Sequence, residues 1–232
     1  MASATEPVAP ERIPDGLGGP FYGVHVGIVV DVHDPEQQGR VQVRLPWVVD
    51  SGGGYQAWAR LATLMAGAGR GSWFIPDVDD EVLLAFEGGD PHRPYVVGSL
   101  WNGKDQPPEQ MGAGNDVRTI RTRSGVTIRM TDARHASLTL ETPAGQRVVL
   151  SDDPGAIVVE DANGNRVAVD AGGIEVTSSA VVSVTAPRVE VAAGMLQVDA
   201  GMSRFSGVVQ ADTVITNAVV SATYTPGAGN IW

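Results

Sequence analysis

The sequence contains no cysteine, so it can form neither disulfide bonds nor thiolate metal sites. No apolar run approaches the ~20 residues that a membrane-spanning helix requires. Residues 1–16 also lack the basic segment followed by an apolar segment that is typical of a signal peptide. We therefore expect a protein made in the cytoplasm, without a signal peptide or transmembrane segment, whose stability comes from burial and hydrogen bonding.

Positive charge is scarce as well. The chain has 16 Lys and Arg residues against 27 Asp and Glu residues, which gives a formal net charge of -11. Nucleic-acid binding depends on Lys and Arg side chains that neutralise phosphates. The charge balance therefore argues against a nucleic-acid partner.

No segment shows the periodicity of an amphipathic helix of ordinary length. Instead, 29 glycines, 15 prolines and many valines favour short strands joined by tight turns. Residues 24–32 and 40–45 are strands separated by a turn, and strands 82–86 and 95–98 flank a glycine-rich turn at 87–91. About five strands in roughly eighty residues predict an OB-type barrel.

The second half of the chain has a different pattern. Short valine-rich strands alternate with turn residues, and from residue 174 onward apolar pairs recur every seven or eight residues, which predicts stacked β-layers. The Gly, Pro and β-branched content argues against a coiled coil. These pairs are the predicted β-helix core: Ile174, Val176, Val182, Val184, Val189, Val191, Leu196 and Val198.

Strands this short have exposed edges and one thin apolar face, so a single copy would be prone to aggregate. Winding several copies around a common axis removes the edges and buries the apolar face. The sequence thus predicts an all-β homotrimer in which an N-terminal OB-fold barrel precedes a C-terminal trimeric intertwined β-helix. The predicted domains are a flexible arm at 1–20, an OB-fold barrel domain at 21–104, a Pro-rich linker at 105–117 and a β-helix domain at 118–232.

Ordered motifs run through the first domain and into the second. They are GRVQVRLPW at 39–47, WAR at 58–60, GAGRG at 67–71, IPDVDDEVL at 75–83, FEGGDPHRPYVVGSLWNG at 86–103, RTRSG at 121–125 and DANGN at 161–165. This set resembles the VgrG and phage baseplate assembly protein V family, the central spikes of contractile injection machines. The resemblance is good over about residues 21–173. In the remainder of the chain only the repeating β pattern is similar.

The resemblance implies a structural spike in a short form, without a fused hub or effector domain. It implies a homotrimer that contacts a separate hub protein at its N-terminal end, a PAAR-like tip protein at its C-terminal end, baseplate and inner-tube proteins, and transiently a target membrane. Two departures stand out: Asp79 replaces the usual family glycine, which is possible in a left-handed backbone, and Val126 replaces a frequent His. The predicted hub or trimer collar contacts are Trp47, Trp58, Arg60, Trp73 and Trp101.

The chain ends on large apolar residues, and an exposed apolar terminus usually marks a contact. We predict that Asn230, Ile231 and Trp232 contact the tip protein. The alternative is that Trp232 folds back onto the stem as a plug.

The sequence offers little support for a metal site or a catalytic site. Asp31, His33 and Asp34 lack a second cluster that would complete a metal shell, and the acids of 77–81 lack calcium-loop spacing. The histidines are scattered without an H-x-H pair, and no nucleophile elbow occurs. We therefore expect no enzymatic activity, no catalytic residue, no metal and no cofactor.

Two alternatives stay open. An OB barrel with a β-solenoid stalk is also compatible with binding of carbohydrate or single-stranded nucleic acid. The one basic concentration is either a stripe that binds nucleic acid or the hub or, as we favour, a set of outward-facing positions paired with neighbouring acids. It comprises Arg118, Arg121, Arg123, Arg129 and Arg134.

Overall fold

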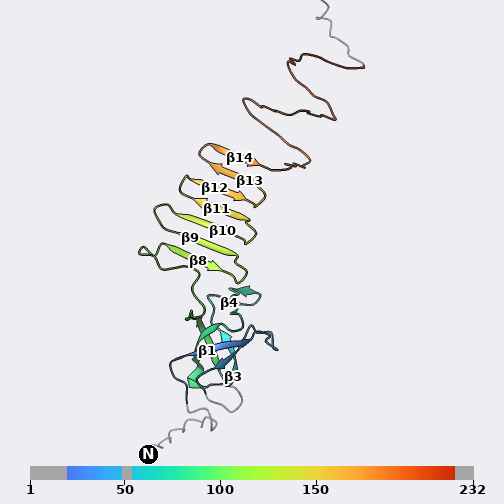
Figure 1. Cartoon of the computed structure of the whole chain (residues 1–232). Helices are drawn as coiled ribbons and strands as arrows, with labels where there is room; N and C mark the ends of the chain where they lie inside the picture. Colours follow the sequence, from blue (N-terminus) through green and yellow to red (C-terminus); the bar gives the residue numbers. More distant parts are fainter. Residues whose placement is uncertain (1–19, 49–53, 223–232) are drawn as a thin grey trace, which may run out of the picture. The chain divides into compact units, whose positions relative to one another are not determined.

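The computed structural model describes residues 20–48 and 54–222, and it confirms the all-β prediction. Every regular element in these ranges is a strand, apart from one short 3₁₀ turn (Figure 1). Within the same ranges, no helix has the length and apolar character needed to cross a membrane. The chain divides into two compact units, and the boundary in the sequence falls between Val181 and Val182.

The first five long strands form a closed barrel in the order β1-β2-β3-β7-β6. A small hairpin, β4 and β5, interrupts the sequence between β3 and β6. The bounds are β1 Val24–Asp31, β2 Val41–Leu45, β3 Tyr55–Leu61, β4 Ala66–Gly67, β5 Arg70–Gly71, β6 Glu81–Phe86 and β7 Pro94–Ser99.

The barrel core consists mainly of aliphatic side chains that alternate along the strands. On β2 the burial alternates residue by residue, as a strand with one face inward requires. Burying each such side chain stabilises the fold by roughly 1.5–3 kcal/mol. The fully buried members include Val29, Val41, Val43, Leu45, Val82 and Leu84.

The predicted turn between β6 and β7 contains the 3₁₀ turn, Glu87–Gly89. Gly88 and Gly89 have φ values of 61° and 84°, in the left-handed region that favours glycine. Gly89 is also close to the preceding chain, since an added Cβ there would lie 2.9 Å from Pro20 Cβ. The glycines therefore serve both the reversal and the close approach.

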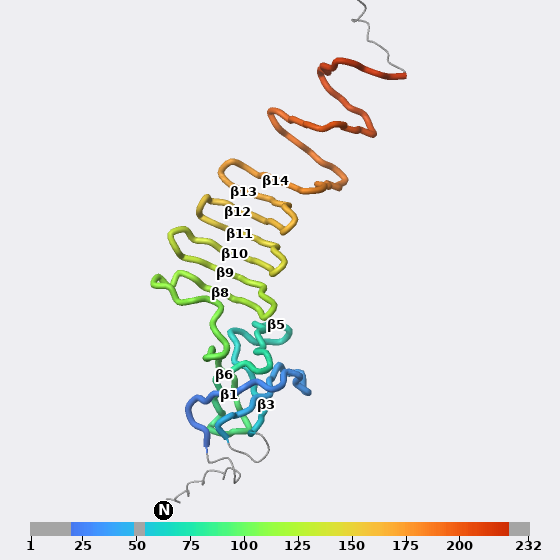
Figure 2. Tube along the Cα trace, in the orientation of Figure 1, coloured from blue at the N-terminus to red at the C-terminus, as the bar shows by residue number. Residues whose placement is uncertain are grey.

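The second sheet is a seven-stranded antiparallel meander in which every strand pairs with its sequence neighbours (Figure 2). Each strand has five residues. The bounds are β8 Val117–Arg121, β9 Thr127–Thr131, β10 Ser137–Glu141, β11 Arg147–Ser151, β12 Ala156–Glu160, β13 Arg166–Asp170 and β14 Gly173–Thr177.

Residues 178–222 contain no strand within the described chain. The structure thus separates two parts of the region that the sequence treats as one β-helix. Turns such as 152–155 and 161–165 allow β8 to β14 to pair within the chain, whereas the later segment has no backbone ladder of its own. The predicted arm at 1–20, apart from Pro20, and the predicted tip contacts Asn230, Ile231 and Trp232 lie outside the described residues.

Candidate assembly surface

The meander β8–β14 carries two parallel rows of apolar side chains on one face. Cross-strand register aligns each row, and because side chains alternate along a strand, both rows point to the same side. We call these two rows the apolar face. The first row is Ile120, Ile128, Leu140, Val148, Val159, Val167 and Val176, and the second is Met130, Leu138, Leu150, Ile157, Val169 and Ile174.

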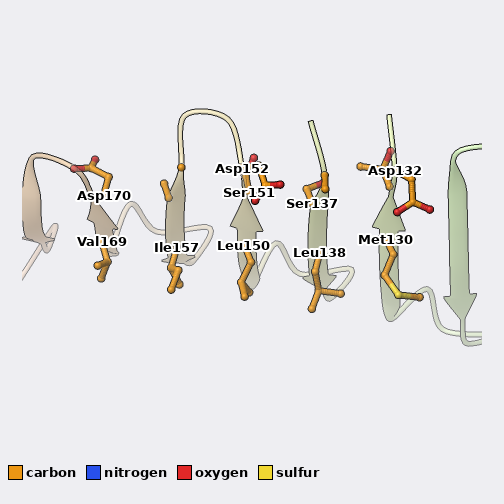
Figure 3. A pocket seen from close by; sticks show the side chains of 14 residues that line it. Met130, Asp132, Ser137, Leu138, Leu150, Ser151, Asp152, Ile157, Val169 and Asp170 are labelled. Atoms are coloured by element: carbon orange, nitrogen blue, oxygen red, sulfur yellow. The ribbon is translucent and has the colours of Figure 1, made fainter. Parts of the chain in front are cut away.

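Within residues 20–48 and 54–222, no segment covers the apolar face. Leu140 is 40% exposed, Val159 is 47% exposed and Ile174 is 74% exposed. Figure 3 shows side chains of the second row on successive strands, where they line an open groove; the labelled members are Met130, Leu138, Leu150, Ile157 and Val169. Soluble monomers rarely expose a continuous apolar patch of this kind, so the face is a candidate interface.

The opposite face of the meander is more polar. Its central row aligns Thr119, Arg129, Thr139, Val149, Val158, Ala168 and Glu175. Two of these residues contact Glu109: Thr119 Oγ1 donates at 2.7 Å and Arg129 Nε lies at 3.1 Å. The Thr119 hydrogen bond and then the Arg129 hydrogen bond lower the pKa of Glu109.

Three of the five clustered arginines pair with acids, as the favoured interpretation predicted. The pairs are Arg118 with Asp132 at 3.4 Å, Arg123 with Asp77 at 2.9 Å and Arg129 with Glu109. Arg118 differs from the expectation of an outward position. It pairs in register with Met130, so it opens the second row of the apolar face.

The predicted β-helix core is split between two environments. Ile174 and Val176 end the two rows on β14, whereas the other six residues lie in 178–222 and are exposed in the single chain. Val184 is 73% exposed and Leu196 is 69% exposed. Strands from other chains would have to supply both side-chain cover and backbone partners there.

The chain leaves the meander at a hydrogen-bonded anchor centred on Asn165. Asn165 Oδ1 accepts from Ser178 Oγ at 2.9 Å and from the Ser179 backbone N–H at 3.1 Å. Asn165 Nδ2 donates to Asp161 Oδ2 at 2.8 Å. The side-chain and backbone hydrogen bonds from Asn165 are the main causes that lower the pKa of Asp161 to about 2. The loop 161–165 therefore fixes where the intrachain sheet ends.

The predicted collar residues do not form one cluster. Trp47 Nε1 donates to Val26 O at 2.8 Å, and its ring stacks on His25 with the centroids 4.6 Å apart. Arg40 lies over the ring of Trp58, and Arg60 lies over the ring of Tyr95. These contacts within the barrel domain were not predicted from the sequence, and the hub or trimer contact of Trp47 and Trp58 stays a prediction.

Trp73 and Trp101 are 74% and 69% exposed, as a contact surface requires. Trp73 lines a groove together with Arg60. Three further apolar residues of that groove were not identified from the sequence, although they flank the glycine motif at 67–71. They are Leu64, Met65 and Phe74.

The candidate metal ligands are engaged in turn formation. Asp34 accepts hydrogen bonds from the backbone N–H groups of Gln38 and Arg40, and His33 Nδ1 lies 2.8 Å from Asp31 Oδ1. Within residues 20–48 and 54–222, no three His, Asp or Glu side chains are grouped so as to hold a metal ion.

Asp79 has a φ of 76°, so the left-handed backbone predicted for this departure from glycine is confirmed. Its backbone N–H donates to Val29 O at 2.9 Å, which joins the loop before β6 to β1. The neighbouring Asp80 Oδ2 accepts from the Asp77 backbone N–H at 2.8 Å. The acids of this loop therefore shape a turn.

Two family models match the chain. The type VI secretion system/phage-baseplate injector OB domain matches residues 25–101, and the phage baseplate V C-terminal trimerisation domain matches residues 137–197. The first match spans the barrel, and the second begins at β10 and extends beyond β14 into the strandless segment.

Curated relatives include type VI secretion system spike proteins of Pseudomonas aeruginosa. VgrG1a is 32% identical over 108 residues, which is 46% of this chain and 17% of VgrG1a. VgrG2a is 28% identical over 144 residues, which is 60% of this chain and 16% of VgrG2a. The actin cross-linking toxin VgrG1 of Vibrio cholerae is 29% identical over 110 residues, which is 47% of this chain and 10% of the toxin. The matches thus span less than a fifth of each of these relatives.

Proposed function

The chain belongs to the phage baseplate V and VgrG spike family, since it carries that family's injector OB domain and C-terminal trimerisation domain, and we propose that it is a structural spike subunit. Three copies form the central spike of a contractile injection machine, with the barrels as a collar and the β-structure as a needle. Its role is mechanical rather than enzymatic.

The uncovered apolar face of β8–β14 is the observation that carries this proposal. Three copies arranged around one axis bury that face inside and leave the polar face toward solvent. Residues 178–222 gain strand partners from the other two copies, which completes their backbone hydrogen bonding. The predicted core residues from Val182 to Val198 then continue the apolar interior.

Such a needle resists bending because its interior is close-packed and its ladders are shared among three chains. Bending would break buried contacts in all three chains together. Contraction of a sheath made by other proteins would drive the needle through a target envelope. A rigid, non-catalytic rod is sufficient for that step.

The two ends serve different partners in this proposal. The exposed Trp73 and Trp101 of the barrel, with the groove beside Arg60, contact a separate hub protein or a neighbouring barrel. Asn230, Ile231 and Trp232 contact a PAAR-like tip protein. Deleting Ile231 and Trp232 is expected to abolish tip-protein binding while the protein remains a trimer, and unchanged binding would remove the tip contact from the proposal.

Native mass measurement tests the core of the proposal. We expect a trimer for the parent chain and loss of the trimer for Leu150→Asp, which puts a charge on the apolar face. Thr139→Asp on the opposite face is the matched control and is expected to remain trimeric. A parent chain that stays monomeric at all concentrations would exclude the spike and favour the alternative, a barrel that binds carbohydrate or single-stranded nucleic acid.

A further inference from the structure

The two lateral edges of the meander β8–β14 differ in charge. At one edge, which we call the acidic edge, the chain enters β8 and turns between β9 and β10, β11 and β12, and β13 and β14. Figure 3 shows Asp132, Asp152 and Asp170 at the same ends of their strands. The acids of this edge are Asp116, Asp132, Asp152, Asp153 and Asp170.

The other edge, which we call the arginine edge, holds the remaining turns. Its basic residues are Arg121, Arg123, Arg147 and Arg166, and its acids are Glu141, Glu160 and Asp161. The acidic edge has Arg134 as its turn cation, Arg118 pairs with its Asp132 at 3.4 Å, and His135 lies beside its Asp153 at 3.3 Å. The acidic edge is therefore more negative than the arginine edge.

The opposite charges of the two edges also occur on the same strands, so they lie at equal heights along the direction in which the strands stack. Strand β13 begins with Arg166 and ends with Asp170, and strand β11 begins with Arg147 and is followed directly by Asp152. Strand β8 shows the same pairing, because Asp116 precedes it and Arg121 ends it. Each of these three strands thus has an aspartate at the acidic edge and an arginine at the arginine edge.

We propose that the acidic edge of one copy docks against the arginine edge of the next copy, at equal height along the needle. This inference rests on the proposed trimer. A closed ring of three chains is a heterologous assembly, in which one edge of each chain meets the other edge of its neighbour. Copies related by rotation about the stacking axis keep their heights, so Asp170 meets Arg166 and Asp152 meets Arg147 of the adjacent copy.

The side chains have the capacity for this second contact. Arg166 Nη1 lies 3.2 Å from Glu175 Oε2, and Arg147 Nη1 lies 3.3 Å from Glu160 Oε1, both within one chain. A guanidinium has five N–H donors in a planar fork. Each arginine can therefore keep its ion pair with the acid on the neighbouring strand and also bind a further carboxylate. Asp170 is exposed and accepts from the Gly172 backbone N–H.

The charge pattern acts mainly on specificity. Two acidic edges brought together would repel, and a shift by one strand would place Asp170 opposite Glu160 or Thr177 rather than Arg166. Exposed ion pairs contribute little affinity, but arranged charges suppress wrong pairings and fix register. The edges therefore select the head-to-tail ring and its axial register.

Cysteine cross-linking tests the register, since the chain has no cysteine of its own. The matched variant is Arg166→Cys with Asp170→Cys, and the mismatched control is Arg121→Cys with Asp170→Cys. Within one chain the matched pair lies ~13 Å apart, from four strand residues, so a shorter bifunctional maleimide bridges only adjacent copies. The mismatched pair differs in height by five strand steps, or ~24 Å.

We expect a covalent trimer on a denaturing gel for the matched variant and none for the mismatched control, with both variants trimeric by native mass. A native trimer that cross-links only in the mismatched variant, or in neither, would overturn the edge pairing and leave the spike proposal intact. A monomeric parent chain would remove both.

Charge removal provides a second, independent measurement. Asp152→Asn with Asp170→Asn is expected to lower the temperature at which the trimer dissociates by several degrees at low salt, with a smaller difference at high salt. Glu141→Gln removes an acid from the arginine edge and is expected not to lower it. Equal effects of the two variants, or an effect independent of salt, would contradict a charge-based docking.

Discussion

Asp34 and Arg40 form a sheltered ion pair that closes the turn between β1 and β2. Arg40 Nη2 lies 2.7 Å from Asp34 Oδ1, and the two side chains are only 16% and 4% exposed, respectively. Asp34 Oδ2 also accepts from the backbone N–H groups of Gln38 and Arg40. One carboxylate therefore organises the whole turn, and the Arg40 hydrogen bond is the largest cause that holds the pKa of Asp34 well below its ordinary value.

The depressed pKa of Asp34 predicts acid sensitivity. Its stabilising contribution is complete above the unfolded pKa of about 4 and is lost as the pH falls toward the folded pKa. We expect Asp34→Asn to lower the unfolding temperature at pH 7 by several degrees. Between pH 5 and pH 3 the unfolding temperature of this variant is expected to fall less than that of the parent chain. Thermal unfolding at several pH values measures both effects, and an identical acid dependence in parent and variant would contradict the assignment.

Replacing Asp79 by glycine is expected to stabilise the fold. The φ of 76° at Asp79 costs an ordinary L-residue about 1 kcal/mol, a strain that glycine does not have. Asp79→Gly is therefore expected to raise the free energy of unfolding by up to about 1 kcal/mol, whereas Asp79→Val lowers it because a β-branched residue tolerates this region poorly. Denaturant unfolding measures the difference, and a less stable glycine variant would show that the Asp79 side chain contributes more than the strain costs.

Replacing Arg118 by an aliphatic residue is expected to stabilise the needle. Arg118 occupies the first position of an otherwise apolar row, next to Met130, and pairs with Asp132. Arg118→Leu adds an apolar side chain to the row, and Asp132, whose side chain is 70% exposed, stays hydrated when it loses its partner. Arg118→Leu is expected to raise the dissociation temperature of the trimer, whereas Thr139→Leu on the opposite face is not. A lower temperature for Arg118→Leu would mean that the pair is needed at the base of the needle.

Removing the Asn165 side chain is expected to destabilise the end of the meander locally. Asn165→Ala removes the acceptor of Ser178 Oγ and of the Ser179 N–H, at a cost of about 1 kcal/mol for each hydrogen bond. We expect faster proteolysis near residue 178 with the barrel intact. Asn163→Ala is the matched control, because in the described chain Asn163 hydrogen bonds to Asp161 rather than to Ser178 or Ser179. Equal cleavage of both variants would assign the effect to the Asp161 loop as a whole.

Much of the fold could be predicted from local patterns. The alternation in residues 40–45, the glycines at 88 and 89 and the left-handed position of Asp79 are properties of short segments, and the barrel contains all three. Trp73 is exposed, and its contact role stays a prediction. Sequence reasoning was weaker for Trp47, because its partners Val26 and His25 are on another strand.

The sequence by itself determined the strands, the turns and the need for an apolar interior, because side-chain alternation and glycine conformations are set within a few residues. Only the tertiary structure decided which strands pair. It showed that the strands of residues 117–177 pair with one another within one chain, that residues 178–222 form no strand in the described chain, and that Arg118 lies on the apolar face. Pairing and register depend on contacts between distant segments, and a one-residue shift in register moves every side chain to the opposite face.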